Sequence, residues 1–157
     1  MLFPLFEWCE ASWLGQLVRT SLWLFPVIEA VHLLGLGLLG GALWIVDLRL
    51  WGFGLRNQSI AEVERGARAW LVAGLVVMIT TGLLLFMSEA VKCYFNPSFW
   101  VLITTLPFAL LYTFAVRQRV ASREGFVTSW RSRLLATMSL LLWFTVAAAG
   151  RWIGFSS

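Results

Sequence analysis

The chain has 157 residues, of which 60% are hydrophobic and 13% charged, and its mean hydropathy is +0.82. This composition is typical of an integral membrane protein and excludes a soluble globular domain. The net charge of +4 does not indicate a nucleic-acid partner, because the basic residues flank the hydrophobic stretches, where they set the membrane orientation. A chain of this length holds one transmembrane domain, residues 1–157, in contact with the lipid bilayer.

The N-terminal segment carries Glu7 and Glu10 and lacks the basic region that begins a cleavable signal peptide. Ser12 is a candidate N-cap, and the tryptophan and leucines that follow it share one helical face. We therefore expect an interfacial helix over about residues 12–22, which lies on the membrane as an anchor or as a lid over the bundle.

Four apolar stretches are long enough to cross a bilayer, which takes roughly 20 residues for a hydrocarbon core of ~30 Å. They cover about residues 26–50, 66–88, 97–117 and 134–154. A capping box from Ser59 to Glu62 begins the second helix before the membrane, and the pair Asn96 and Pro97 begins the third. The sequence predicts an all-α, four-helix membrane bundle with an N-terminal interfacial helix, whose third span is kinked at Pro107.

Most of the Lys and Arg residues lie in or beside the first and third connections between these spans. They are Arg49, Arg56, Arg65, Arg68, Arg117, Arg119, Arg123, Arg131 and Arg133. The positive-inside rule then places both connections in the cytoplasm and both termini in the periplasm, so we expect a multi-pass protein of the bacterial inner membrane. Cys9 and Cys93 fall on the oxidising outer side of the membrane. They either form a disulfide there or remain two free thiols, and the sequence does not decide between these alternatives.

The first span contains an ionisable pair, Glu29 and His32, and His32 is the single histidine of the chain. Residues three apart lie on one helical face, so both side chains are expected to point into the protein. Burying such a group in a membrane costs ~2.5 kcal/mol or more, which makes the pair a functional-site hypothesis. Glu89 and Arg151 fall in the same outer third of the bundle. They either form one site with Glu29 and His32, or Arg151 pairs with a carboxylate for structural reasons and extends its charged end to the membrane interface.

The first interpretation is a haem b site in an electron-transfer protein. His32 would supply an axial nitrogen, the small residues around Gly35 would leave space for a flat macrocycle, and Arg151 would pair with the propionates. The sixth position would be empty, filled by Met87, or filled by His32 of a second protomer. No catalytic residue is indicated, because no nucleophile has an obvious base beside it and no phosphate-binding loop of the P-loop type occurs.

Other interpretations remain open. Glu29 and His32 have the E-x-x-H spacing of carboxylate-bridged metal sites in four-helix bundles, which a homodimer would double and Glu89 would extend. Copper or iron would then replace haem. A proton relay from Glu29 and His32 toward Asp47 is a further hypothesis, although apolar residues separate the two ends. The protein could also be a structural or accessory subunit without a cofactor.

The first span carries a G-x-x-x-G pattern at Gly37 and Gly41, and the fourth has a run of small residues from Ala147 to Gly150. Small residues let transmembrane helices approach closely. We therefore expect a homo-oligomer or partner membrane subunits.

Three runs of sequence, HLLGLGLLGGALWIVDLRLWG, LFMSEAVKCYFNPSFW and GRWIGF, resemble a family of small uncharacterised bacterial inner-membrane proteins with four helices. The resemblance spans nearly the whole chain and implies the same fold without implying an activity. More loosely, a histidine followed by a glycine-rich stretch is similar to copper-resistance protein D and to cytochrome b561-like proteins. Those groups bind haem or copper through several span histidines, whereas this chain has one.

Overall fold

The computed structural model describes residues 2–55, 57–123 and 129–155, and in these residues it is helical without strands. Its helical segments follow one another in this order: α1 (Phe3–Ala11), α2 (Trp13–Thr20), α3 (Leu24–Trp51), α4 (Ile60–Ser88), α5 (Ala90–Phe95), α6 (Pro97–Leu111), the π-helix η1 (Tyr112–Arg117), α7 (Gln118–Ala121) and α8 (Trp130–Phe155).

Four of these helical stretches are long and apolar enough to cross a membrane. They are Leu24–Trp51, Ile60–Ser88, Pro97–Ala121 and Trp130–Phe155. The prediction of an all-α protein with four helices long and apolar enough to cross a membrane is therefore confirmed in the described residues. Each expected span lies inside an observed helix, apart from small differences at the ends, where local capping decides the boundary.

The predicted starts of α4 and α6 are confirmed by their capping hydrogen bonds. The Ser59 hydroxyl accepts from the Glu62 amide at 3.2 Å, and the Glu62 carboxylate accepts from the Ser59 amide at 2.7 Å. These reciprocal bonds satisfy two donors that the first turn of a helix otherwise leaves unpaired. At α6, the Asn96 side chain accepts from the Ser98 amide at 2.9 Å, with Pro97 in the first turn.

The third span departs from regular α-helix near its C-terminal end. Pro107 lies inside α6, and the hydrogen-bond register widens to a π-helix five residues later, at Tyr112. A π-helical turn holds an extra residue, which rotates the following side chains relative to a continuous α-helix. Arg117 and Gln118, at the end of this turn, are buried.

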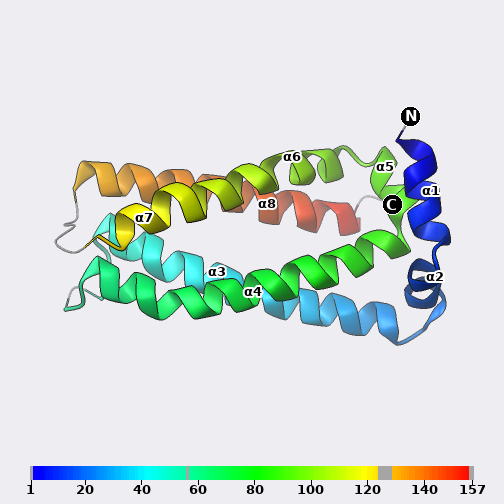
Figure 1. Ribbon diagram of the computed structural model, residues 1–157, viewed down its shortest axis with the longest axis horizontal. Helices are drawn as coiled ribbons and strands as arrows, with labels where there is room; N and C mark the ends of the chain where they lie inside the picture. The colour runs from blue at the N-terminus through cyan, green and yellow to red at the C-terminus, as the bar shows by residue number, and fades with distance from the viewer. Residues whose placement is uncertain (1, 56, 124–128, 156–157) are drawn as a thin grey trace.

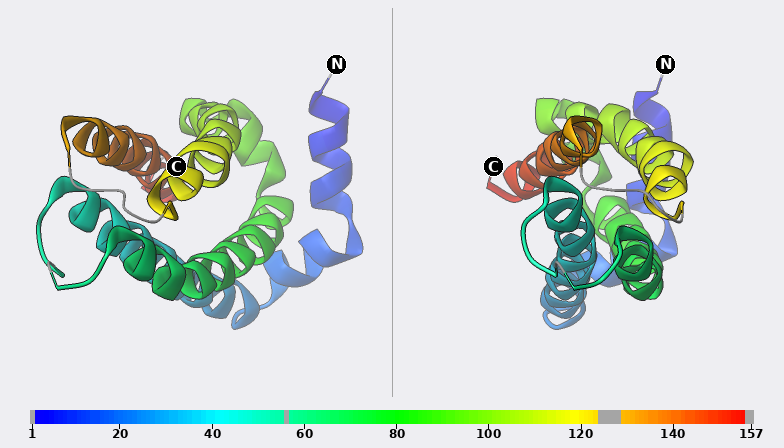
Figure 2. Two further views of the ribbon diagram at one scale, coloured as in Figure 1. Left: turned by 60° about the vertical axis from the view of Figure 1, so that its left-hand side comes forward. Right: turned by 90° about the vertical axis from the view of Figure 1, so that its left-hand side faces the viewer.

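The helices pack as two pairs, α3 along α4 and α6 along α8, and α8 also packs against α3. Figure 1 shows both termini at one end of the molecule, where α1 and α2 lie across the bundle next to α5. The α3–α4 connection and α7 lie at the opposite end, and the left view of Figure 2 again shows α1 and the α3–α4 connection on opposite sides of the molecule. We call the end with the termini the outer end and the opposite end the inner end.

The N-terminal segment forms two short helices where one interfacial helix over about residues 12–22 was expected. Ser12 has extended backbone angles and its hydroxyl accepts from the Gly15 amide at 3.2 Å, so it begins α2 as predicted. The residues before it form α1, which the sequence did not indicate. Glycine at position 15 allows α2 to lie directly on α4, since a Cβ there would stand 2.6 Å from the Met87 carbonyl oxygen.

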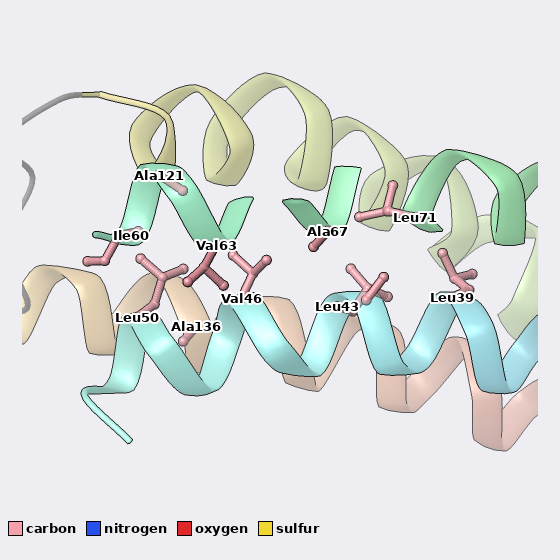
Figure 3. Packing of buried hydrophobic residues seen from close by; sticks show 11 residues of the cluster. Leu39, Leu43, Val46, Leu50, Ile60, Val63, Ala67, Leu71, Ala121 and Ala136 are labelled. Carbon is pink, nitrogen blue, oxygen red and sulfur yellow. The ribbon is translucent and has the colours of Figure 1, made fainter. Parts of the chain in front are cut away.

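A hydrophobic cluster fills the inner half between α3 and α4 (Figure 3), where stripes from both helices interdigitate. On α3 the stripe consists of Leu39, Leu43, Val46 and Leu50, at the three- and four-residue spacing of one helical face. Gly74 brings the helices together, because a Cβ there would lie 2.7 Å from the Leu39 nitrogen. A second cluster, Phe6, Ala90, Cys93 and Phe99, joins α1, α5 and α6 at the outer end.

Candidate functional site

The inner half contains a buried ion pair. An Arg117 guanidinium nitrogen (Nη1) in η1 lies 2.9 Å from Asp47 Oδ1 in α3, and each side chain is only 1% exposed. Ser139 of α8 donates its hydroxyl proton to Asp47 Oδ2 at 2.7 Å. The pair therefore fastens three helices to one another inside the bundle, where an unpaired charge would be very costly.

Other side chains of the inner half donate hydrogen bonds to backbone carbonyl or hydroxyl groups. Ser132 donates to the Leu50 carbonyl at 2.9 Å, and the Trp143 indole donates to the Thr113 hydroxyl at 2.9 Å. In the described part of the chain, Arg117 Nε is the one buried side-chain nitrogen or oxygen without a hydrogen-bond partner. The other buried side-chain nitrogens and oxygens of the described residues each have a hydrogen-bond partner.

In the outer half, His32 is half-buried and contacts α4. Its Nδ1 lies 2.7 Å from the Thr81 hydroxyl oxygen, and that hydroxyl lies 2.5 Å from the Val77 carbonyl oxygen. A carbonyl only accepts, so the single hydroxyl proton of Thr81 goes to Val77 and the Thr81 oxygen accepts from Nδ1–H. His32 is thereby held in the tautomer with the proton on Nδ1, and its Nε2 keeps a free lone pair.

Gly82 and Gly35 set how closely the two helices approach around this histidine. A Cβ at Gly82 would stand 3.3 Å from His32 Cε1, so the missing side chain makes room for the imidazole. A Cβ at Gly35 would stand 2.7 Å from Val77 Cγ1. The space beside Gly35 is therefore occupied by α4.

Glu29 lies one turn before His32 and acts on it electrostatically. It is half-buried and makes no hydrogen bond or ion pair with any described residue. Asp47 follows Glu29 by eighteen residues, or five turns, so both carboxylates lie on the α3 face that meets α8 and η1 at the inner end. Buried Leu39 and Leu43 stand between the two ends, and no polar chain joins them through the described residues.

The other predicted site residues have separate neighbours. The Arg151 guanidinium lies over the Phe155 ring of its own helix, with 4.4 Å between the guanidinium carbon and the ring centroid. Glu89 lies 3.6 Å from the Lys92 ammonium across the start of α5. Met87 belongs to the last turn of α4, where its carbonyl meets Gly15. No hydrogen bond or ion pair of the described residues joins Arg151, Glu89 or Met87 to His32.

The described residues contain no group of three or more His, Cys, Asp or Glu side chains placed to hold one metal ion. A carboxylate-bridged metal site therefore has no complete ligand set within the described part of one chain. Of the predicted metal ligands, His32 and Glu29 lie one turn apart on α3 and interact electrostatically.

Sequence reasoning missed the roles of Arg117, Ser139 and Thr81. Arg117 follows an apolar stretch and precedes other arginines, so the sequence indicates a cytoplasmic loop residue, whereas the structure buries it against Asp47. The buried aspartate was the available signal, because a carboxylate inside a span needs a cationic or hydroxyl partner. Thr81 gave no signal, since threonines are common in transmembrane helices.

A protein-family model matches residues 5–156, which include the four long helices. No curated protein and no solved structure shows a significant match to the chain. The looser likeness to copper-resistance protein D and cytochrome b561-like proteins therefore gains no support. The likeness to small uncharacterised membrane proteins agrees with the family match: the chain belongs to DUF6644, a family of unknown function.

Proposed function

We propose that this protein binds haem b through His32 in the outer half of the bundle and acts as an electron-transfer component of the bacterial inner membrane, with both termini in the periplasm. The observation that carries the proposal is the hydrogen bond between His32 Nδ1 and Thr81. A histidine that ligates iron donates its other ring N–H to a neighbouring acceptor, which fixes the tautomer and the ring orientation. Thr81 supplies such an acceptor.

The position of His32 supports the same site. It lies eight residues after Leu24, the first residue of α3, and therefore about 12 Å along the helix axis at ~1.5 Å per residue. This depth suits a group that exchanges electrons with the outer face. The chain offers one histidine, so the iron would keep an open sixth position or bind His32 of a second copy.

The test is an absorption spectrum of the purified protein, before and after dithionite, from cells supplied with haem precursors. Wild type is expected to show a Soret band and reduced α and β bands, and His32→Ala is expected to lose them. Arg119→Ala, which changes an exposed arginine at the inner end, is the control for general damage and should retain the band. A featureless wild-type spectrum with no bound iron would refute the haem proposal.

The same sample separates haem from a simple metal site formed by Glu29 and His32 of two copies. Copper or iron in stoichiometric amounts, without a Soret band and lost in Glu29→Ala, would identify a metal site. Elemental analysis of wild type beside this variant makes that measurement.

A second candidate function is that of an accessory subunit without a cofactor, and a surface groove favours it. The groove has a volume of about 400 Å³ and runs between α3 and α4, lined by Gly37, Gly41, Gly66 and Trp70 among others. A Cβ at any of these three glycines would meet nothing within 4 Å. Glycine-lined surfaces of this kind accept a neighbouring transmembrane helix.

Association through this groove is measured by the mass of the detergent-solubilised complex. Gly41→Leu, which fills the groove, is expected to dissociate it. Gly40→Leu adds the same bulk to α3 at a position that does not line the groove and should leave the mass unchanged. An equal mass for wild type and Gly41→Leu would count against a helix in this groove.

A further inference from the structure

The contacts between α1 and α5 fix the relative direction of the two helices. The Glu10 carboxylate accepts a hydrogen bond from the Val91 amide at 2.8 Å. The Phe6 ring packs edge-on against Tyr94 with ring centroids 5.2 Å apart, and Phe3 lies 5.7 Å from Phe95. Residue numbers fall along α1 as they rise along α5, so the helices run antiparallel.

These contacts bracket the two cysteines of the chain. Cys9 lies between Phe6 and Glu10, and Cys93 lies between Val91 and Tyr94. Both also face the same interior, because Cys93 is a buried member of the outer cluster and Cys9 packs against that cluster. Antiparallel register and a shared cluster place the two side chains across one helix contact.

We propose that Cys9 and Cys93 form a disulfide cross-linking site that locks the N-terminal helices onto the outer end of the bundle. In the structure both thiols are free, so this is the reduced state of the site. The required oxidant is a small-molecule or protein disulfide.

The chemistry proceeds by two thiol–disulfide exchanges. The Cys9 thiolate attacks one sulfur of the oxidant, which breaks the oxidant's disulfide, forms a mixed disulfide and releases one thiol. The Cys93 thiolate then attacks the Cys9 sulfur and releases the second thiol. The protein loses two protons and two electrons, and the oxidant gains both.

Accessibility sets the order of the two steps. Cys9 is half-buried, whereas Cys93 is 5% exposed. Burial, with the nearby Glu89 and Glu10 carboxylates, raises the pKa of the Cys93 thiol to about 11, although the Lys92 ammonium opposes the shift. Cys93 is therefore a protected second nucleophile, and closure of the disulfide is the slow step.

The disulfide would preserve contacts of α1 that are already present in the reduced protein. Glu10 also forms an ion pair with Arg19 of α2, and the Ser12 hydroxyl bonds the Cys9 carbonyl at 2.5 Å. A covalent bond at Cys9 therefore retains α1 in a position that the reduced protein already adopts. It prevents α1 from leaving the outer end, where it packs against α5 and α4.

The experiment incubates the reduced, detergent-solubilised protein with oxidised glutathione and then labels free thiols with a polyethylene-glycol maleimide after denaturation. Wild type is expected to lose both reactive thiols while remaining monomeric on a non-reducing gel. Below pH 10, closure is expected to accelerate about tenfold per pH unit as the Cys93 thiolate becomes more abundant. Cys9→Ser and Cys93→Ser each retain one thiol that cannot form an internal cross-link.

The folded structure must bring the two thiols together, so the same incubation in denaturing detergent should give mixed disulfides with glutathione in place of the internal cross-link. Two thiols that stay reactive in the folded protein would overturn the proposal. A cross-link found only between chains would overturn it as well. These outcomes do not depend on haem, so the disulfide site and the proposed function succeed or fail separately.

Discussion

In the inner half, the buried charges of Asp47 and Arg117 bind each other, whereas in the outer half Glu29 and His32 keep unused hydrogen-bonding capacity. At the inner end, Asp47 is fully engaged by Arg117 and Ser139. At the outer end, His32 keeps a free Nε2 and Glu29 makes no hydrogen bond with a described residue. Both halves place ionisable residues in a membrane span, so this difference separates a structural pair from a candidate ligand site.

The largest effect is expected from breaking the inner pair. Arg117→Ala leaves the Asp47 carboxylate buried without a cation, which costs about 3–5 kcal/mol. The free energy of unfolding, measured by circular dichroism in mixed micelles with increasing dodecyl sulfate, should fall by this amount. Arg119→Ala changes an exposed arginine two residues later and should change it by less than about 0.5 kcal/mol.

Removing both charges tests whether the pair is structural. The double variant Asp47→Leu with Arg117→Met replaces the ions by apolar groups of similar volume, which is often neutral or stabilising. It should regain most of the stability that Arg117→Ala loses. A double variant as unstable as Arg117→Ala would mean that the network does more than join the helices.

Disrupting the α3–α4 packing between the two halves is expected to lower the free energy of unfolding by an intermediate amount. Gly74→Ala places a methyl group against the Leu39 backbone at 2.7 Å, which forces α3 and α4 apart and costs about 1–3 kcal/mol. Gly40→Ala meets nothing within 4 Å and should stabilise α3 by about 0.5–1 kcal/mol. Equal changes in the unfolding free energy for both variants would show that close α3–α4 contact is not required.

Substitutions beside His32 in the outer half are expected to change ligand affinity more than the free energy of unfolding. Thr81→Val removes the acceptor for His32 Nδ1–H and should weaken cofactor binding by roughly 10–100-fold, while the unfolding free energy falls by only about 1 kcal/mol. Thr81→Ser keeps the hydroxyl and should restore the affinity. Titration of the purified apoprotein with haem, followed at the Soret band, compares the three proteins.

Local signals in the sequence were sufficient for the four long helices, but they were insufficient for α1, for the π-helical turn η1 and for the contacts between helices. The capping residues at Ser59 and Asn96 act within three residues, so pattern reading finds them. Arg117 pairs with an aspartate seventy residues away, and its inward direction depends on the π-helical register of η1, which has no sequence signature. His32 was recognisable as the single histidine in a span, but its partner Thr81 is forty-nine residues distant and chemically ordinary.

The smallest effect on stability is expected at Glu29, and it is the most direct test of the contrast between the two halves. Glu29→Gln keeps the side-chain shape and removes a charge that no described residue binds, so the unfolding free energy should change by less than about 0.5 kcal/mol. Asp47→Asn is the matched change on the same face of α3, and it leaves the Arg117 cation buried without its counter-ion. That variant should lose several kcal/mol in the same measurement. If Glu29→Gln proved equally destabilising, Glu29 would be part of a structural pair as Asp47 is. The hypothesis that its charge serves ligand binding beside His32 would then be wrong.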